Sequence, residues 1–108
     1  MESMPKALVT EVAEKILRYL ATLPEGTETY TFQAFIDVYG EESILDWDVV
    51  INGEQYDRFV LFSIDREIRD RAKKHGLKLD SSMYDDMVTG LPYNIGYFIK
   101  KRSTSKQQ

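Results

Sequence analysis

Residues 54 to 79, EQYDRFVLFSIDREIRDRAKKHGLKL, contain the change of periodicity that decides the fold. Up to His75 the apolar residues recur at the spacing of one helical face, as expected for the buried stripe of an amphipathic helix. This stripe consists of Val60, Leu61, Ile64, Ile68 and Ala72. Gly76 follows two lysines and a histidine, which is typical of a helix C-terminus. The stretch predicts a helix from about Glu54 to His75 and a strand that starts at Leu77.

A β-hairpin from Leu77 to Lys101 is predicted after this helix. Leu77 and Leu79 alternate with polar residues, and a second alternating run follows at residues 95 to 99. We expect Leu79 and Ile99 to face the helices. Residues 103 to 108 have no apolar side chain to bury, so we expect a disordered polar tail after a single domain of residues 1 to 102.

Two shorter helices and a strand are predicted before residue 54. The first helix runs from about Pro5 to Leu23, with a proline in its first turn and an apolar face at helical spacing. Residues 28 to 31 fit a very short strand, while Thr31 also fits the N-cap of a second helix that ends at Gly40. Residues 41 to 53 fit either a short helix followed by a strand or an irregular connection, and end in an Asn52-Gly53 turn.

The composition limits the classes of protein that the chain can belong to. A length of 108 residues with 43% apolar side chains fits one domain with its own core. The absence of cysteine excludes disulfides, thiol catalysis and thiolate zinc sites, and the single histidine leaves few other metal ligands. No apolar run approaches the roughly 18 residues of a membrane span, and Glu2, Glu11 and Glu14 lie where a secretory signal would be apolar. We therefore expect a cytoplasmic protein without membrane contact.

Charge is distributed unevenly along the chain, although its net value is only -4. Residues 1 to 57 contain 3 basic and 12 acidic side chains, whereas residues 58 to 108 contain 11 basic and 6 acidic ones. Such an asymmetry points to an anionic partner for the basic part.

The order helix, short strand, helix, longer helix and hairpin resembles that of winged helix-turn-helix domains. The resemblance covers residues 5 to 101 and implies an α+β fold, a three-helix winged-helix-like domain with a C-terminal β-hairpin wing. It also implies that the helix at 54 to 75 is the recognition helix and the hairpin at 77 to 101 the wing. The stretch from Gly40 to Gly53 is longer than the usual connection between the second and third helices.

Cations of the third helix and the hairpin are the candidate DNA-binding residues. On a helical wheel, Arg58, Arg66, Arg69 and Lys73 share one face opposite the apolar stripe. Guanidinium groups on such a face can reach guanine edges, and ammonium groups can meet phosphates. The set is completed by Lys74, Lys78, Lys100, Lys101 and Arg102.

The same cations also fit a solvated helix surface stabilised by salt bridges. Four acid-first pairs are spaced four residues apart, an arrangement that stabilises a helix by ~0.2 to 0.5 kcal/mol per pair. They are Glu54-Arg58, Asp65-Arg69, Glu67-Arg71 and Asp70-Lys74.

An acidic segment and the single histidine carry the remaining candidate sites. Glu41, Glu42, Asp46 and Asp48 lack the spacing of a calcium loop, and Trp47 between the two aspartates fits either the core or an apolar anchor for a protein partner. His75 fits a capping residue better than a catalytic base. No nucleophile elbow, phosphate loop or dinucleotide motif is present, so we expect neither an enzyme nor a cofactor.

Two functions follow from these observations. The first is a small protein that binds double-stranded DNA in transcription regulation or an accessory-element process, with its first helix as a candidate homodimer contact. The alternative is a non-enzymatic module for protein–protein interaction that uses the acidic half of the chain and Trp47. Because one fold can serve both uses, the architecture alone does not separate them.

Overall fold

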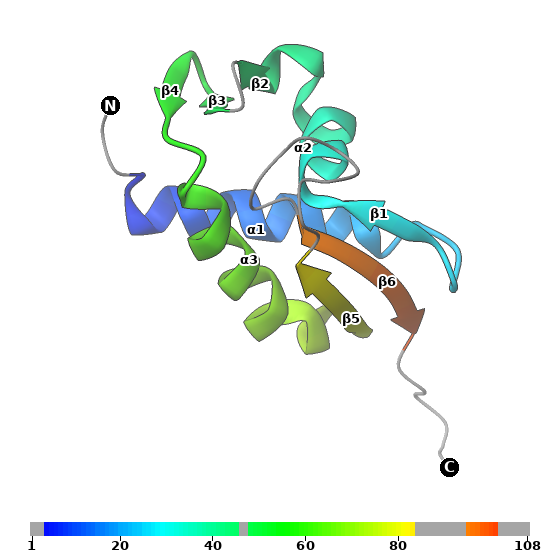
Figure 1. The fold of residues 1–108 in the computed structure, drawn as a ribbon. Coiled ribbons are helices and arrows are strands. Elements are labelled where there is room, and N and C mark those ends of the chain that lie inside the picture. Colours follow the sequence, from blue (N-terminus) through cyan, green and yellow to red (C-terminus); the bar gives the residue numbers. More distant parts are fainter. Residues whose placement is uncertain (1–3, 46–47, 84–94, 102–108) are drawn as a thin grey trace.

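The computed structural model describes residues 4–45, 48–83 and 95–101 of the chain. Within these residues the fold is mixed α+β, with three α-helices and two small antiparallel sheets (Figure 1). The first sheet has the strand order β1-β6-β5 and the second the order β2-β3-β4. Figure 1 shows the two sheets at opposite ends of α3.

Helix α1, Lys6–Leu20, supplies the largest share of the core. Its buried face is the one predicted from the sequence and consists of Val9, Val12, Ala13, Ile16, Leu17 and Leu20. Pro5 occupies the N-cap position, and the helix ends three residues earlier than predicted. The amides of Thr22 and Leu23 bond to carbonyls three residues back, so the chain leaves the helix through a tighter turn.

Strand β1, Glu28–Tyr30, leads directly into helix α2, Thr31–Tyr39, which confirms the predicted short strand and second helix. Phe35 is fully buried and its ring stacks on Tyr39 at a centroid distance of 5.8 Å. Gly40 ends α2 with a φ of 98°, a conformation that glycine adopts without a steric penalty.

A second sheet fills the segment between α2 and α3. The 3-10 turn η1, Glu41–Ser43, is followed by β2, Ile44–Leu45, β3, Asp48–Ile51, and β4, Glu54–Tyr56. Asn52 and Gly53 both have positive φ, 54° and 80°, as required in the two-residue turns that join antiparallel strands. The predicted turn is therefore confirmed as the turn of the β3–β4 hairpin.

Helix α3, Val60–Arg71, is shorter than the predicted third helix, and the prediction for residues 54 to 59 was wrong. Residues 54 to 56 pair with β3 as a strand, and the Asp57 carboxylate accepts a hydrogen bond from the Phe59 amide at 2.9 Å. That contact turns the chain into the helix. The 3-10 turn η2, Ala72–His75, then leads to Gly76, whose left-handed conformation confirms the predicted helix end.

Strands β5, Leu77–Met83, and β6, Ile95–Lys101, form the predicted antiparallel hairpin. Leu79 is opposite Ile99 in register, with Ile99 fully buried and Leu79 packed at the margin of the core. β6 also pairs with β1 and is the central strand of its sheet. The connection at 84 to 94 and the predicted tail lie outside the described residues.

No helix in the described ranges is long and apolar enough to cross a membrane.

Candidate nucleic-acid interface

The outward face of α3 and η2 carries three of the predicted cations. Arg66, Arg69 and Lys73 are exposed, while Leu61, Ile64 and Ile68 on the opposite face are fully buried. The helical spacing of these residues thus places them on one solvent-facing surface, as predicted from the sequence.

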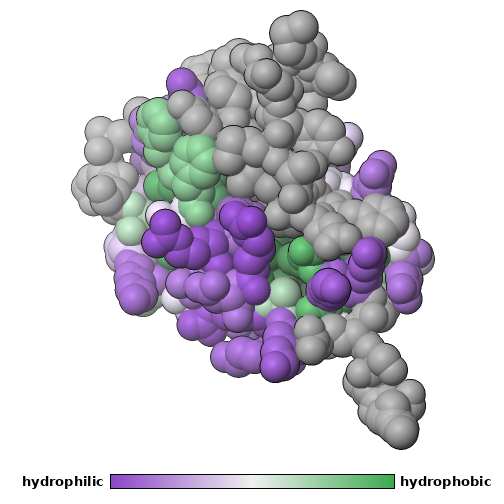
Figure 2. Space-filling model, turned by 60° about the horizontal axis from the view of Figure 1, so that its bottom comes forward, coloured by the Kyte–Doolittle hydropathy of each residue, from purple (hydrophilic) through white to green (hydrophobic). Residues whose placement is uncertain are grey.

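Two adjacent hollows lie along this face and share Arg69 as a lining residue. One, of about 370 Å³, is lined by residues of α3 only, namely Phe62, Asp65, Arg66, Arg69 and Asp70. The other, of about 200 Å³, lies between the end of α3 and strand β5. It is lined by Arg69, Ala72, Lys73, Leu77, Lys78 and Leu79. Figure 2 shows apolar surface between groups of hydrophilic side chains on this side of the molecule.

Arg69 is bound to a buried carboxylate on its own helix. Its Nη2 donates to Asp65 Oδ2 at 2.5 Å, and only 2% of the Asp65 side chain is exposed, against 55% for Arg69. This contact confirms one of the acid-first pairs predicted from spacing. Because a buried carboxylate needs a charged or hydrogen-bonded partner, Arg69 has a structural role.

Arg58 does not belong to this surface, and its placement with the helical cations was wrong. It precedes α3 and forms an ion pair with Asp48 of β3 at 3.9 Å, while its guanidinium lies over the Phe59 ring. Since Glu54 is in a strand, the predicted Glu54-Arg58 helical pair is absent. Arg58 therefore joins the second sheet to the start of α3.

The remaining predicted cations lie in η2, on the hairpin and beyond its last strand. Lys74 is exposed in η2 but lines neither hollow, and no ion pair joins it to Asp70 within the described residues. Lys78 and Lys100 are directly opposite each other on β5 and β6. Lys101 ends β6, and Arg102 lies outside the described residues, as does Trp47.

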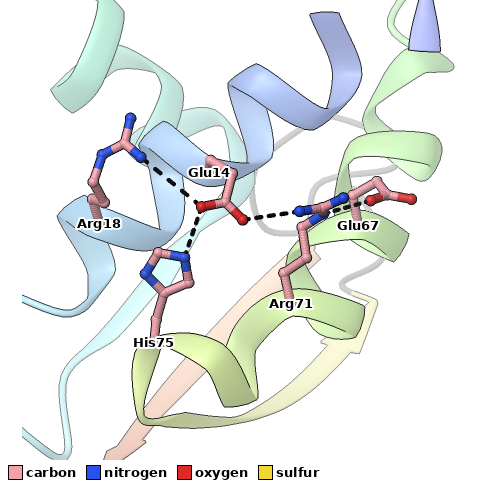
Figure 3. A network of polar contacts seen from close by, with 5 residues as sticks. All are labelled: Glu14, Arg18, Glu67, Arg71 and His75. Carbon is pink, nitrogen blue, oxygen red and sulfur yellow. Dashed lines mark hydrogen bonds and ion pairs between the residues drawn. The ribbon is translucent and has the colours of Figure 1, made fainter. Parts of the chain in front are cut away.

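The flank of α3 that faces α1 contains a polar network that sequence spacing only partly predicted (Figure 3). Glu14 of α1 is at its centre, with Oε2 3.2 Å from Arg71 Nη1 and Oε1 3.0 Å from His75 Nε2. Arg71 also donates to Glu67 at 2.8 Å, the predicted pair, and Arg18 lies 3.9 Å from Glu14. His75 thus contacts α1 through its ring.

The network shifts the pKa values of its charged groups in the directions expected for ion pairs. Burial opposes ionisation of Glu14, but the hydrogen bonds and charges of His75 and Arg71 outweigh it and lower the pKa of Glu14. Hydrogen bonds to Glu67 and Glu14 raise the pKa of Arg71. Both shifts stabilise the charged forms that hold α1 and α3 together.

The long-range partners in these contacts could not be found by sequence reasoning. Glu67-Arg71 and Glu14-Arg18 are acid-first pairs at helical spacing, and these pairs are the local signals of the network. The contact between Glu14 and His75 spans 61 positions, and that between Asp48 and Arg58 needs the β3–β4 hairpin. The described residues contain no group of three or more His, Asp or Glu that could bind a metal ion.

Comparison of the chain with protein-family models, with curated proteins and with solved structures found no match.

Proposed function

We propose that the chain is a winged-helix-like domain that binds double-stranded DNA through the face formed by α3, η2 and β5. The order of elements and the strand order β1-β6-β5 support the fold assignment, since a hairpin after the third helix pairs with a strand between the first two. The second sheet occupies the place of the short turn that usually joins the second and third helices. It lies at the N-terminal end of α3, away from β5 (Figure 1).

The observation that carries the proposal is the availability of Arg66 and Lys73. Both are exposed, each lines one of the adjacent hollows, and neither has an acidic partner among the described residues. A guanidinium in this state can reach a base edge, and an ammonium can contact a phosphate. Arg71, by contrast, is held by Glu14 and Glu67 on the other flank.

Lys78 of β5 extends the proposed interface beyond the helix. It is exposed and lines the same hollow as Lys73. An ammonium group in this position can contact a phosphate of the duplex. The proposed interface therefore includes Lys78 together with Arg66 and Lys73.

Duplex binding at several salt concentrations tests this function. We expect Lys73→Ala and Lys78→Ala each to reduce the slope of log affinity against log salt by about one, as for loss of one phosphate contact. Arg66→Ala should lower affinity by about 1 to 3 kcal/mol and relax the preference at one base pair. Lys6→Ala, which removes an exposed cation from α1, is the matched control and should leave the slope unchanged.

Thermal unfolding of each variant shows whether its fold is intact. Absence of duplex binding by the folded wild-type chain at about 50 mM salt, where phosphate contacts are strong, would refute the proposal. Equal losses in Lys6→Ala and Lys73→Ala would also refute it, because binding would then depend on net charge alone.

A protein-binding role is the second candidate, and two exposed apolar side chains favour it. Leu45 of β2 is 50% exposed and Phe59, just before α3, is 51% exposed. An exposed large apolar side chain can anchor a contact with another protein. Leu45→Ser and Phe59→Ser variants that keep duplex binding but lose a protein partner would separate this role from the first.

A further inference from the structure

The outer edge of strand β5 offers backbone groups for pairing beside the smaller hollow. The Ile99 amide donates to the Thr27 carbonyl at 2.9 Å, and the Ile99 carbonyl accepts from the Gly26 amide at 2.9 Å. In an antiparallel strand the two backbone groups of one residue point to the same side, so those of Ile99 face β1. Its partner Leu79 therefore belongs to a non-hydrogen-bonded pair, and the Leu79 N–H and C=O point away from the sheet.

These outward groups of Leu79 have no hydrogen-bond partner in the part of the chain that the structure describes. β5 is an edge strand of its sheet, and Leu79 lines the hollow between η2 and β5. A free donor and acceptor on one edge residue form a template for one more strand.

The side chains around this edge define which strand would fit. Ala72, Leu77 and Leu79 form an apolar floor, because Ala72 and Leu77 are buried and Leu79 is half-buried. Lys73 on the helical side and Lys78 on the strand are both exposed and border the same hollow. An occupant should therefore pair through its backbone, place an apolar side chain on the floor and carry negative charge towards both lysines.

We propose that an extended acidic peptide segment, with apolar and acidic residues in alternation, binds as a fourth strand along β5 at Leu79. Alternation fits because successive side chains of a strand point to opposite faces. Main-chain hydrogen bonds supply affinity in this mode of recognition, and side-chain pockets supply specificity. This site shares Lys73 and Lys78 with the proposed duplex interface but adds the Leu79 backbone, which DNA does not need.

A simpler role for Lys78 is protection of the edge against pairing between copies of the chain. That role explains one lysine on the strand, but it does not explain an apolar floor flanked by a second lysine from η2. If Lys78 only protects the edge strand, no acidic peptide should bind at β5. A measurement of peptide binding therefore distinguishes edge protection from peptide recognition.

The test uses a fluorescein-labelled peptide of alternating glutamate and valine, with fluorescence anisotropy as the readout. Leu79→Pro removes the outward N–H and is compatible with an edge strand whose N–H faces solvent. Leu79→Val is the matched control, since valine and proline have the same number of side-chain carbons but valine keeps the N–H. We expect Leu79→Pro to bind the peptide about tenfold more weakly than Leu79→Val.

Two further measurements on the full chain test the contribution of the two lysines and the pairing of the peptide with the Leu79 backbone. Lys73→Ala and Lys78→Ala should each weaken peptide binding several-fold at low salt and less at high salt, whereas Lys6→Ala should not. Peptide addition should slow hydrogen exchange of the Leu79 amide, because a paired N–H is protected.

Three results would overturn the inference. The first is that folded Leu79→Pro and Leu79→Val bind the peptide with equal affinity. The second is that a lysine–valine peptide binds as tightly as the glutamate–valine peptide. The third is that the chain binds duplex DNA but does not bind the acidic peptide. Leu79→Pro is also expected to bind duplex DNA like Leu79→Val. Failure of peptide recognition and failure of DNA binding are therefore distinguished by the same pair of variants.

Discussion

The two flanks of α3 and η2 carry similar basic side chains in different environments. On the flank facing α1, Arg71 and His75 both contact Glu14, and the contacts join two helices. On the other flank, which carries the two hollows and extends towards β5, Arg66 and Lys73 are exposed and have no acidic partner among the described residues. Both flanks come from one run of alternating charges, so the presence of a partner, and not the spacing, separates a structural cation from one available for binding.

Arg69 provides the strongest test of this division, because it lies on the β5 flank but contacts a buried carboxylate. Arg69→Met removes a charge-assisted hydrogen bond from Asp65, which we expect to lower the free energy of unfolding by about 1 to 3 kcal/mol. Urea denaturation measures the change. Stability equal to that of the wild type would show that Arg69 belongs with the binding cations.

Glu14→Gln tests the α1 flank directly. The substitution keeps the size of the side chain but removes the charge that faces Arg71 and His75. Because these contacts are partly exposed, we expect a loss of about 1 kcal/mol or less in the free energy of unfolding at neutral pH. Duplex binding should be unchanged, and a large loss of affinity would place this flank in the interface.

The pH dependence of stability sharpens the same comparison. The pKa of Glu14 is lowered from its ordinary value of 4.5, so its contribution is fully present above that pH and is lost as the pH falls through the folded-state pKa. The stability difference between wild type and Glu14→Gln should therefore be present above about pH 4.5 and shrink below it. Denaturation curves at several pH values measure it, and a difference independent of pH would contradict the role of the carboxylate charge.

Lys78→Glu should have a smaller effect of opposite sign. It replaces a like-charge pair across β5 and β6 with an opposite-charge pair, which we expect to raise the free energy of unfolding by roughly 0.2 to 1 kcal/mol. Duplex affinity should fall at the same time. A rise in affinity together with stability would argue against an anionic ligand on this face.

The smallest effect is expected for Arg66→Met. Without a partner to lose, the variant should be as stable as the wild type within about 0.5 kcal/mol. Its effect should appear in duplex affinity alone. A destabilisation comparable to that of Arg69→Met would remove the distinction between the two arginines.

Local signals in the sequence predicted most of the main elements of the fold. The apolar face of α1, the glycine ends at Gly40 and Gly76, and the inward-facing Leu79 and Ile99 of the hairpin all depend on residues close in sequence or on strict alternation. The second sheet was not predicted, because its strands have only two to four residues each. Their stability comes from pairs such as Val49 with Tyr56, which periodicity does not reveal.

The sequence also predicted only part of the candidate site. Helical spacing placed Arg66, Arg69 and Lys73 on one surface, but it could not show that the partner of Arg69 is buried. It also assigned Arg58 to the helix, since its spacing from Glu54 is that of a helical pair. The missing information in each case is tertiary: which segment packs against the helix and how deeply.

The central position of β6 has a consequence for how the chain folds as it is synthesised. Tyr30 of β1 pairs with Gly96 of β6, 66 positions later (30 to 96). At translation rates of ~5 to 20 residues per second, β1 would wait for roughly 3 to 13 s before its partner exists. During that interval the apolar side chains of α1 lack the cover that Leu77 and Ile99 later give the core. The nascent chain is therefore expected to need a chaperone or the ribosome surface most just before its central strand emerges.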